Sequence, residues 1–160
     1  MSGRGVLFAL DDEDLARLGE ARSDREVLDI VTDLEERWEN ACELDRAWDA
    51  IHRALTDGRL DLRDASPPLS RAILGGTVLV RTEAAIVSVK GADDVVAIAK
   101  ALAPWDEARF RAGYQRIDRN DYGDLDEEDF GYTFAWFERL APFYARAARE
   151  ERAIVFAVDL

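Results

Sequence analysis

The stretch ELDRAWDAIHRALTDG at residues 43–58, followed by PPLSRAILGG at residues 67–76, decides the fold of this chain. The first part predicts a helix, because its apolar residues recur at the spacing of one helical face: Leu44, Ala47, Trp48, Ile51 and Leu55. Gly58 suits the end of that helix. The connector at residues 59–71 is predicted to be non-helical, since its two prolines lack the backbone N–H that a helix interior needs.

Apolar runs on both sides of this stretch predict β-strands. The predicted strands lie at residues 5–10, 77–80, 84–89 and 153–158. In the first strand, alternate residues place Val6, Phe8 and Leu10 on one face. The last run, AIVFAV, is apolar at every position, which is typical of a central strand that is covered on both faces.

Apolar residues at helical spacing predict further helices, at residues 13–21, 23–38, 93–102, 105–117 and 127–151. The helix at 23–38 begins with Ser23 and Glu26, which form a capping box, and its apolar stripe ends at Trp38. The last of these segments is expected to be one long helix that Pro142 kinks, because the proline ring clashes with the preceding turn.

The order of these elements favours an α/β fold, because helices separate most of the strands. We expect a small mixed β-sheet sandwiched by helices, which is a three-layer α/β/α arrangement, with an α+β fold as the alternative. The length of 160 residues is that of a single domain, residues 1–160. A chain of this size can bury a sizeable core without metal or disulfide staples.

The composition is that of a strongly acidic protein, in which 34 Asp and Glu against 21 Lys and Arg leave a formal net charge of −13. That field disfavours binding to the phosphate backbone of a nucleic acid and favours either simple solubility or a basic protein partner. No segment has the features of a signal peptide or the roughly 18 apolar residues that cross a bilayer. We therefore expect a cytoplasmic protein with no membrane partner, and the oligomeric state stays open.

The chain lacks the residues that several chemistries require. A single His and a single Cys exclude the usual zinc sites, and Cys42 is expected to be buried and inert in a helical stretch. The Gly-x-Gly at residues 3–5 precedes a strand instead of following one, so it is no dinucleotide-binding turn. Gly75 and Gly76 are not followed by the Lys and the Ser or Thr of a phosphate loop. The sequence therefore predicts no metal and no cofactor, and it leaves open whether the protein is an enzyme.

Residues 118–129, DRNDYGDLDEED, have the outline of a calcium-binding loop. Such a loop needs oxygen ligands at positions 1, 3 and 5 and a Glu that binds with both oxygens at position 12. Here Tyr122 stands at position 5, and the shorter Asp129 stands at position 12. We favour the alternative of a solvated connector, in which Asp126 caps the following helix and the acidic residues after it interact with the helix dipole.

One group of polar residues shares a side of the helix predicted at 43–58. It recurs at i, i+4, i+7 and i+11 and consists of Asp45, Asp49, His52 and Thr56. Because the group lies beside the apolar stripe, His52 is expected at the border between core and water. A carboxylate one turn away would stabilise the imidazolium and suit a general acid or base. The alternative is a boundary histidine that pairs locally with Asp49 on a solvated face.

The segments 43–58 and 67–76 also contain a recognisable motif. It consists of Leu-Asp-x-x-x-Trp, an apolar-His pair, a Leu-Thr-Gly turn, Pro-Leu, an apolar triplet and Gly-Gly. The matching residues are Leu44, Asp45, Trp48, Ile51, His52, Leu55, Thr56, Pro68, Leu69, Ile73, Leu74, Gly75 and Gly76, and Asp57 interrupts the turn. The chain thereby resembles the YfbM-like family, small bacterial proteins with a domain of unknown function (family 1877), over nearly its whole length. The resemblance implies a three-layer α/β/α fold and no particular activity.

Two functions fit these residues. The first is a binding or interaction module, which in one concrete form neutralises a basic partner through its negative charge. The alternative is a small enzyme or small-molecule-binding domain with a pocket around Trp48 and His52. The candidate pocket residues are Trp48, His52, Thr56, Asp45, Asp49, Ser70, Arg71, Gly75 and Gly76. In that pocket the glycine pair would let backbone approach a ligand closely.

Overall fold

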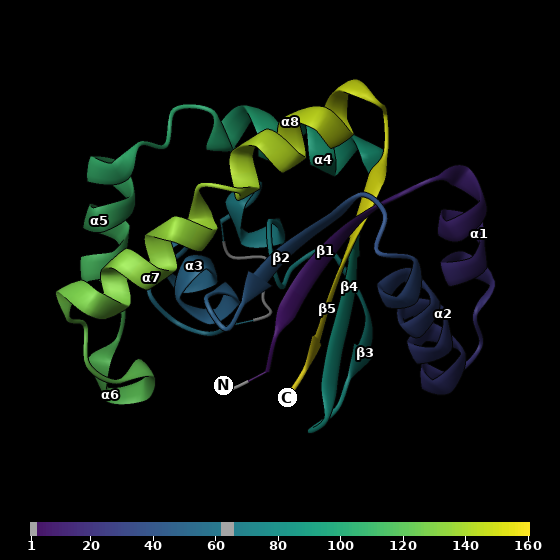
Figure 1. Cartoon of the computed structure of the whole chain (residues 1–160), viewed down its shortest axis with the longest axis horizontal. Coiled ribbons are helices and arrows are strands. Elements are labelled where there is room, and N and C mark those ends of the chain that lie inside the picture. The colour runs from purple at the N-terminus through teal and green to yellow at the C-terminus, as the bar shows by residue number, and fades with distance from the viewer. Residues whose placement is uncertain (1–2, 62–65) are drawn as a thin grey trace.

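A β-sheet forms the centre of the molecule, as seen in the computed structural model, which describes residues 3–61 and 66–160 (Figure 1). Within those residues the sheet has five strands in the order β2-β1-β5-β4-β3. The strands are β1 (Gly5–Leu10), β2 (Ala41–Asp45), β3 (Thr77–Arg81), β4 (Ala85–Lys90) and β5 (Ala153–Asp159). The α/β class is therefore confirmed.

Every neighbouring pair in this sheet is antiparallel, so the expectation of a mixed sheet is wrong in that detail. The helical connections suggested parallel crossovers, because parallel strands need such long links. The links from β1 to β2, from β3 to β4 and from β4 to β5 instead each start and finish at the same end of the sheet. A connection of that kind makes consecutive strands run in opposite directions whatever helices it contains.

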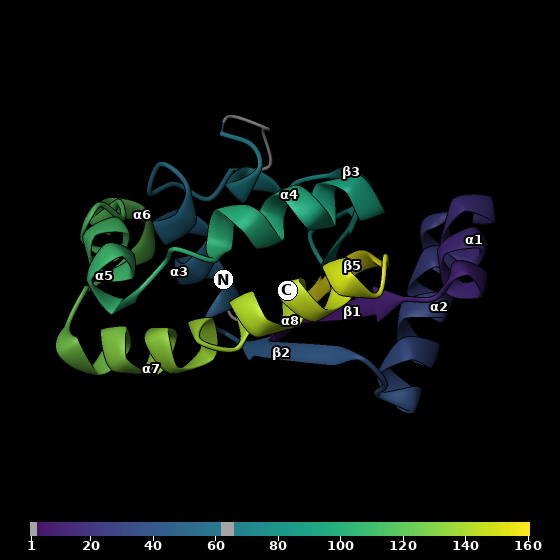
Figure 2. The same ribbon diagram turned by 90° about the horizontal axis from the view of Figure 1, so that it is seen from above.

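Helices cover both faces of the sheet, which gives the expected three layers (Figures 1 and 2). One face packs against α1 (Asp12–Glu20) and α2 (Asp24–Arg37) and receives Val6, Phe8 and Leu10 of β1. The opposite face receives Leu7 of β1 and is covered by helices from later in the chain. These helices are α3 (Trp48–Leu55), α4 (Ala92–Leu102), α7 (Glu127–Phe137) and α8 (Leu140–Arg149), and α5 (Glu107–Gln115) packs against α3.

β5 is the central strand, as its continuous apolar sequence predicted. Its residues alternate between the two cores, with Ile154, Phe156 and Val158 on one side and Ala153, Val155 and Ala157 on the other. All six are buried. Each core thus obtains three apolar side chains from one seven-residue strand.

Residues 41–45 form the edge strand β2, where the sequence predicted the start of a helix. Cys42 and Leu44 point into the core while their neighbours are half-buried, and this two-residue alternation is the strand signal that was overlooked. Asp45 then takes a positive φ of 48° and ends the strand, so α3 begins at Trp48. Cys42 is buried as predicted, but it lies in a strand; burial raises the pKa of its thiol to about 12.

The segment predicted as one kinked helix is two helices, α7 and α8, which are separated at Glu138 and Arg139. Pro142 is the third residue of α8. The first backbone N–H groups of a helix have no partner within the helix, so proline costs no hydrogen bond there. The proline therefore belongs to a helix start, and the kink that the sequence predicted is replaced by a break.

The N-caps of α2 and α7 are the residues that the sequence predicted. Ser23 caps α2 and Asp126 caps α7, each by accepting a hydrogen bond from the backbone N–H three residues on. Trp38 differs from the prediction, because it lies beyond the last turn of α2 and is 49% exposed.

The connector at 59–71 is only partly visible, since its residues 62–65 lie outside the described part of the chain. Of the remainder, η1 (Leu69–Arg71) is a single 3-10 turn that contacts α3, so the Trp48 helix and the Pro-Leu to Gly-Gly segment are adjacent as expected. In the described ranges 3–61 and 66–160, no helix has the length and apolar character needed to cross a bilayer.

Candidate functional site: an acidic cavity at the end of the edge strand

A cavity of about 700 Å³ opens where β2 ends and α3 begins. The short helix α6 (Arg119–Tyr122), the link after it and α7 form the opposite wall. Its lining consists of Arg4, Asp45, Arg46, Asp49, Tyr122, Asp124, Asp129 and Tyr132. Four carboxylates and two guanidinium groups therefore face one space, and we call it the acidic cavity.

Asp45 is held in place by neighbours from both walls of the acidic cavity. The hydroxyl of Tyr132 donates to Asp45 Oδ2 at 2.5 Å, and Arg4 Nε lies 3.3 Å from Asp45 Oδ1. Burial, followed by the hydrogen bond to Asp45, raises the pKa of Tyr132 to about 12. The phenol thus stays a hydrogen-bond donor at neutral pH and fixes the carboxylate.

Asp129 is fixed in the same way by two tyrosines. The hydroxyl groups of Tyr114 and Tyr122 donate to Asp129 Oδ2 at 2.5 Å and 2.9 Å. Burial, and then the hydrogen bond to Asp129, raises the pKa of each tyrosine. The carboxylate is therefore oriented before any partner arrives.

Asp49 forms a buried ion pair in the wall of the acidic cavity. Arg53 Nε lies 2.5 Å from Asp49 Oδ1, and the two side chains are only 3% and 7% exposed. Arg53 also lies 2.9 Å from Asp121 and over the ring of Tyr122. Asp49 thus pairs with Arg53, so the expectation of a local pair with His52 on a solvated face is wrong.

The acidic connector at 118–129 folds into α6 and the start of α7. Asp118 caps α6, and Asp126 caps α7 as predicted. Tyr122, which broke the calcium pattern, is one of the donors to Asp129. In the ranges 3–61 and 66–160, no three His, Cys, Asp or Glu residues are placed so that they would hold a metal ion.

His52 lies in the interior, where the sequence predicted the border between core and water. The residue is 1% exposed, and its Nε2 lies 2.9 Å from the carbonyl oxygen of Asp61. Burial lowers the pKa of His52 to about 4, because a charged imidazolium loses its hydration there. The nearby ammonium of Lys90 adds to that shift. The helix α3 is buried on every side, because α5 and α7 cover it on the side away from the sheet.

Lys90 is a buried cation that the sequence reasoning did not consider. It is 0% exposed, and its Nζ lies 2.5 Å from both Ile73 O and Ser88 Oγ. Burial lowers the pKa of Lys90 well below its usual value. One signal was available: Lys90 is the last residue of the mostly apolar strand β4 and is one of only two lysines in the chain.

Three more of the predicted pocket residues form contacts within the chain: Trp48, Thr56 and Arg71. Trp48 is fully buried, and its indole N–H donates to Gly3 O at 2.8 Å. Thr56 donates to the carbonyl oxygen of His52, and Arg71 pairs with Asp94 at 2.7 Å. Of the nine candidates, Asp45 and Asp49 line the acidic cavity, and ligand binding by all nine stays a prediction.

The glycine pair and Ser70 lie against the chain itself. Ser70 is 1% exposed. A Cβ on Gly75 would come within 2.3 Å of Ser70 O, and a Cβ on Gly76 within 2.4 Å of Val89 O. Gly76 also has a φ of +101°. The close backbone approach that the sequence suggested is therefore made to neighbouring carbonyl groups of the same chain.

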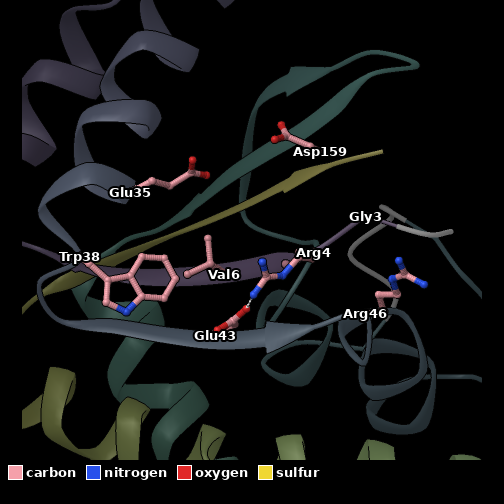
Figure 3. A pocket seen from close by; sticks show the side chains of 9 residues that line it. Gly3, Arg4, Val6, Glu35, Trp38, Glu43, Arg46 and Asp159 are labelled. Atoms are coloured by element: carbon pink, nitrogen blue, oxygen red, sulfur yellow. Dashed lines mark hydrogen bonds and ion pairs between the residues drawn. The ribbon is translucent and has the colours of Figure 1, made fainter.

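A second cavity, of about 460 Å³, lies on the α2 side of the sheet (Figure 3). It shares Arg4 and Arg46 with the acidic cavity and is otherwise lined by Gly3, Gly5, Val6, Glu35, Trp38, Glu43 and Asp159. We call it the Trp38 cavity. Sequence reasoning missed it because its walls come from β1, α2, β2 and β5, which no local motif connects.

The comparisons with known proteins cover almost the whole chain. The sequence profile of a domain of unknown function, DUF1877, matches residues 1–157. The chain belongs to the DUF1877 family. The resemblance predicted from the motif around Trp48 is thereby confirmed.

A solved structure similar to this DUF1877 chain is that of YfbM from Escherichia coli, whose title calls it a protein of unknown function. The TM-score is 0.74 at 22% sequence identity, and the match covers 97% of this chain and 99% of YfbM. A likeness at that identity concerns the fold alone, and it agrees with the α/β class. None of the curated proteins matches the sequence. Membership of the DUF1877 family thus assigns a fold and leaves the activity to be argued from the site.

Proposed function

We propose that this DUF1877 protein is a binding module that receives cationic side chains of a basic protein partner in the acidic cavity. The observation that carries the proposal is the convergence of Asp45, Asp49, Asp124 and Asp129 on one space beside two tyrosine rings. The formal net charge of −13 supports it, because such a field attracts basic partners over a distance.

The chemistry of the acidic cavity suits a guanidinium or ammonium group in particular. Tyrosine hydroxyls orient Asp45 and Asp129, so an incoming cation meets fixed acceptors and orders few side chains on binding. The chain's own Arg53 illustrates the arrangement, since it contacts the carboxylate of Asp49 and lies over the ring of Tyr122. An arginine of the partner would likewise pair with the carboxylate of Asp129 and lie over the ring of Tyr132.

Removing the charges of Asp45 and Asp129 is expected to weaken binding of a basic peptide at least tenfold, which is about 1.4 kcal/mol. The change is Asp45→Asn with Asp129→Asn, because asparagine still accepts the tyrosine hydrogen bonds. The probe is a decapeptide of alternating Arg and Gly, and the measurement is calorimetry at about 50 mM salt, where screening is modest.

The matched control removes the same amount of charge elsewhere, by Glu83→Gln with Asp93→Asn. Both residues are exposed and lie outside the acidic cavity. The control is expected to change the dissociation constant less than twofold. If both double variants weaken binding equally, only the overall field attracts the peptide, and the cavity is not its site.

A further inference from the structure

The Trp38 cavity takes no part in the proposed function. Trp38 follows α2 with φ 48° and ψ 44°, a left-handed conformation that bulky residues rarely adopt. This conformation returns the indole toward the sheet, where it packs at a right angle to Phe8 with ring centroids 5.7 Å apart. About half of Trp38 is still exposed, and its ring lies beside Val6 at the cavity (Figure 3). The cavity thus has one aromatic wall and an apolar floor.

Two carboxylates that line this cavity form no ion pair with a described residue, although Arg4 and Arg46 line it as well. Glu35 comes from α2 and Asp159 from the end of β5, and Figure 3 shows both on the side opposite the Arg4–Glu43 pair. Burial, and then the negative charge of Asp159, raises the pKa of Glu35. The second of these causes is the repulsion between the two charges across a partly desolvated space. A cation between them would relieve the repulsion.

The remaining walls restrict which cation fits. Glu43 is already paired with Arg4, so it offers no free charge. A metal ion is disfavoured, because in the described part of the chain no three His, Cys, Asp or Glu side chains are placed so that they could hold one. An apolar floor at Val6 and an indole wall suit a cation that carries methyl groups, since such a group has few hydrogen bonds to lose. The volume of about 460 Å³ is within the range of small-ligand sites.

We infer that the Trp38 cavity binds an alkylated ammonium group, with its methyl groups against Trp38 and Val6 and its charge facing Glu35 and Asp159. Trp38 provides the cation–π contact, and the two carboxylates provide the long-range attraction. The ligand class is that of choline or a trimethylated amine. It differs from the hydrogen-bonding cations proposed for the acidic cavity, because no tyrosine hydroxyl of the described residues orients Glu35 or Asp159 as such hydroxyls orient Asp45 and Asp129.

Titration of the full chain with choline chloride, followed by NMR, tests this inference. Saturable shifts of signals from Trp38 and Val6 are expected with choline. They are not expected with 3,3-dimethylbutanol, which has the same shape without the charge. Trp38→Leu is expected to weaken choline binding about tenfold, and Trp38→Phe less, because a phenyl ring keeps a weaker cation–π contact.

The charge contribution is tested by Glu35→Gln with Asp159→Asn, which is expected to weaken choline binding at least fivefold. The double variant Asp45→Asn with Asp129→Asn should bind choline like the unchanged protein, and Trp38→Leu should bind the Arg-Gly peptide like the unchanged protein. These crossed controls separate the two cavities. Equal binding of choline and its neutral analogue, or unchanged binding by Trp38→Leu, would overturn the inference.

Discussion

Replacing Trp48 with alanine is expected to lower the free energy of unfolding by about 4 kcal/mol, the range found for deletion of a buried Trp or Phe. Trp48 is 0% exposed, and its ring lies 5.8 Å from that of Phe156 between centroids. Its indole N–H donates to Gly3 O at 2.8 Å and so ties α3 to the chain just before β1. Urea unfolding followed by far-ultraviolet circular dichroism measures the change without relying on tryptophan fluorescence.

Two further variants separate the packing of Trp48 from its hydrogen bond. Trp48→Phe keeps most of the ring and is expected to cost about 2 kcal/mol, from the lost N–H bond and the smaller volume. Gly5→Ala places a Cβ 2.8 Å from the Trp48 ring, so it should destabilise the unchanged protein. The same change should cost less beside Trp48→Ala, which removes the contact with the indole and leaves only the one with Phe156 Cε1 at 2.9 Å. Additive effects of the two changes would contradict the contact.

Acidification from pH 7 to pH 4 is expected to remove about 3 kcal/mol of stability through His52 alone. Burial lowers the pKa of His52 from 6.5 to about 4 in the folded chain, so the unfolded chain binds a proton more readily. The contribution is fully present above pH 6.5 and is lost as the pH falls through about 4. The magnitude follows from about 1.36 kcal/mol for each unit of pKa difference.

His52→Gln is the matched variant, because an amide can still donate to Asp61 O and does not titrate. The stability difference between this variant and the unchanged protein should shift by about 3 kcal/mol in favour of the variant between pH 7 and pH 4. The chain has one histidine, so its ring proton signals in NMR need no assignment. A ring that titrates near pH 6.5 in the folded protein would show that it is not buried as described.

Most of the fold could be predicted from short-range patterns. Alternation in residues 5–10 and the continuous apolar run at 153–158 identified β1 and the central strand β5, and Ser23 marked the start of α2. The edge strand β2 was missed because only Arg46 and Ala47 separate it from α3 and its apolar residues continue the helical spacing. Strand direction could not be predicted either, since it depends on where each connection returns to the sheet.

The candidate site was predicted less completely, for a physical reason. Helical spacing identified Asp45 and Asp49, which line the acidic cavity, but it placed the buried His52 at the border between core and water. Whether a helix has one buried face or is buried all round depends on the helices that cover it, and α5 and α7 follow α3 by more than 50 residues. The contribution of Tyr132 arises from contact with Asp45, 87 residues away in sequence. Spacing along one helix contains no information about such contacts.

The place of β5 between β1 and β4 has a consequence for synthesis on the ribosome. β1 and β2 pair with each other, as do β3 and β4, but in the described chain only β5 hydrogen-bonds to both pairs. Until residues 153–159 emerge, each of the two strand pairs therefore has an unpaired inner edge, which is prone to wrong pairing with other nascent chains. We expect closure of the sheet to occur only after translation of the last strand, and early release of a shortened polypeptide to yield aggregates instead of a smaller stable domain.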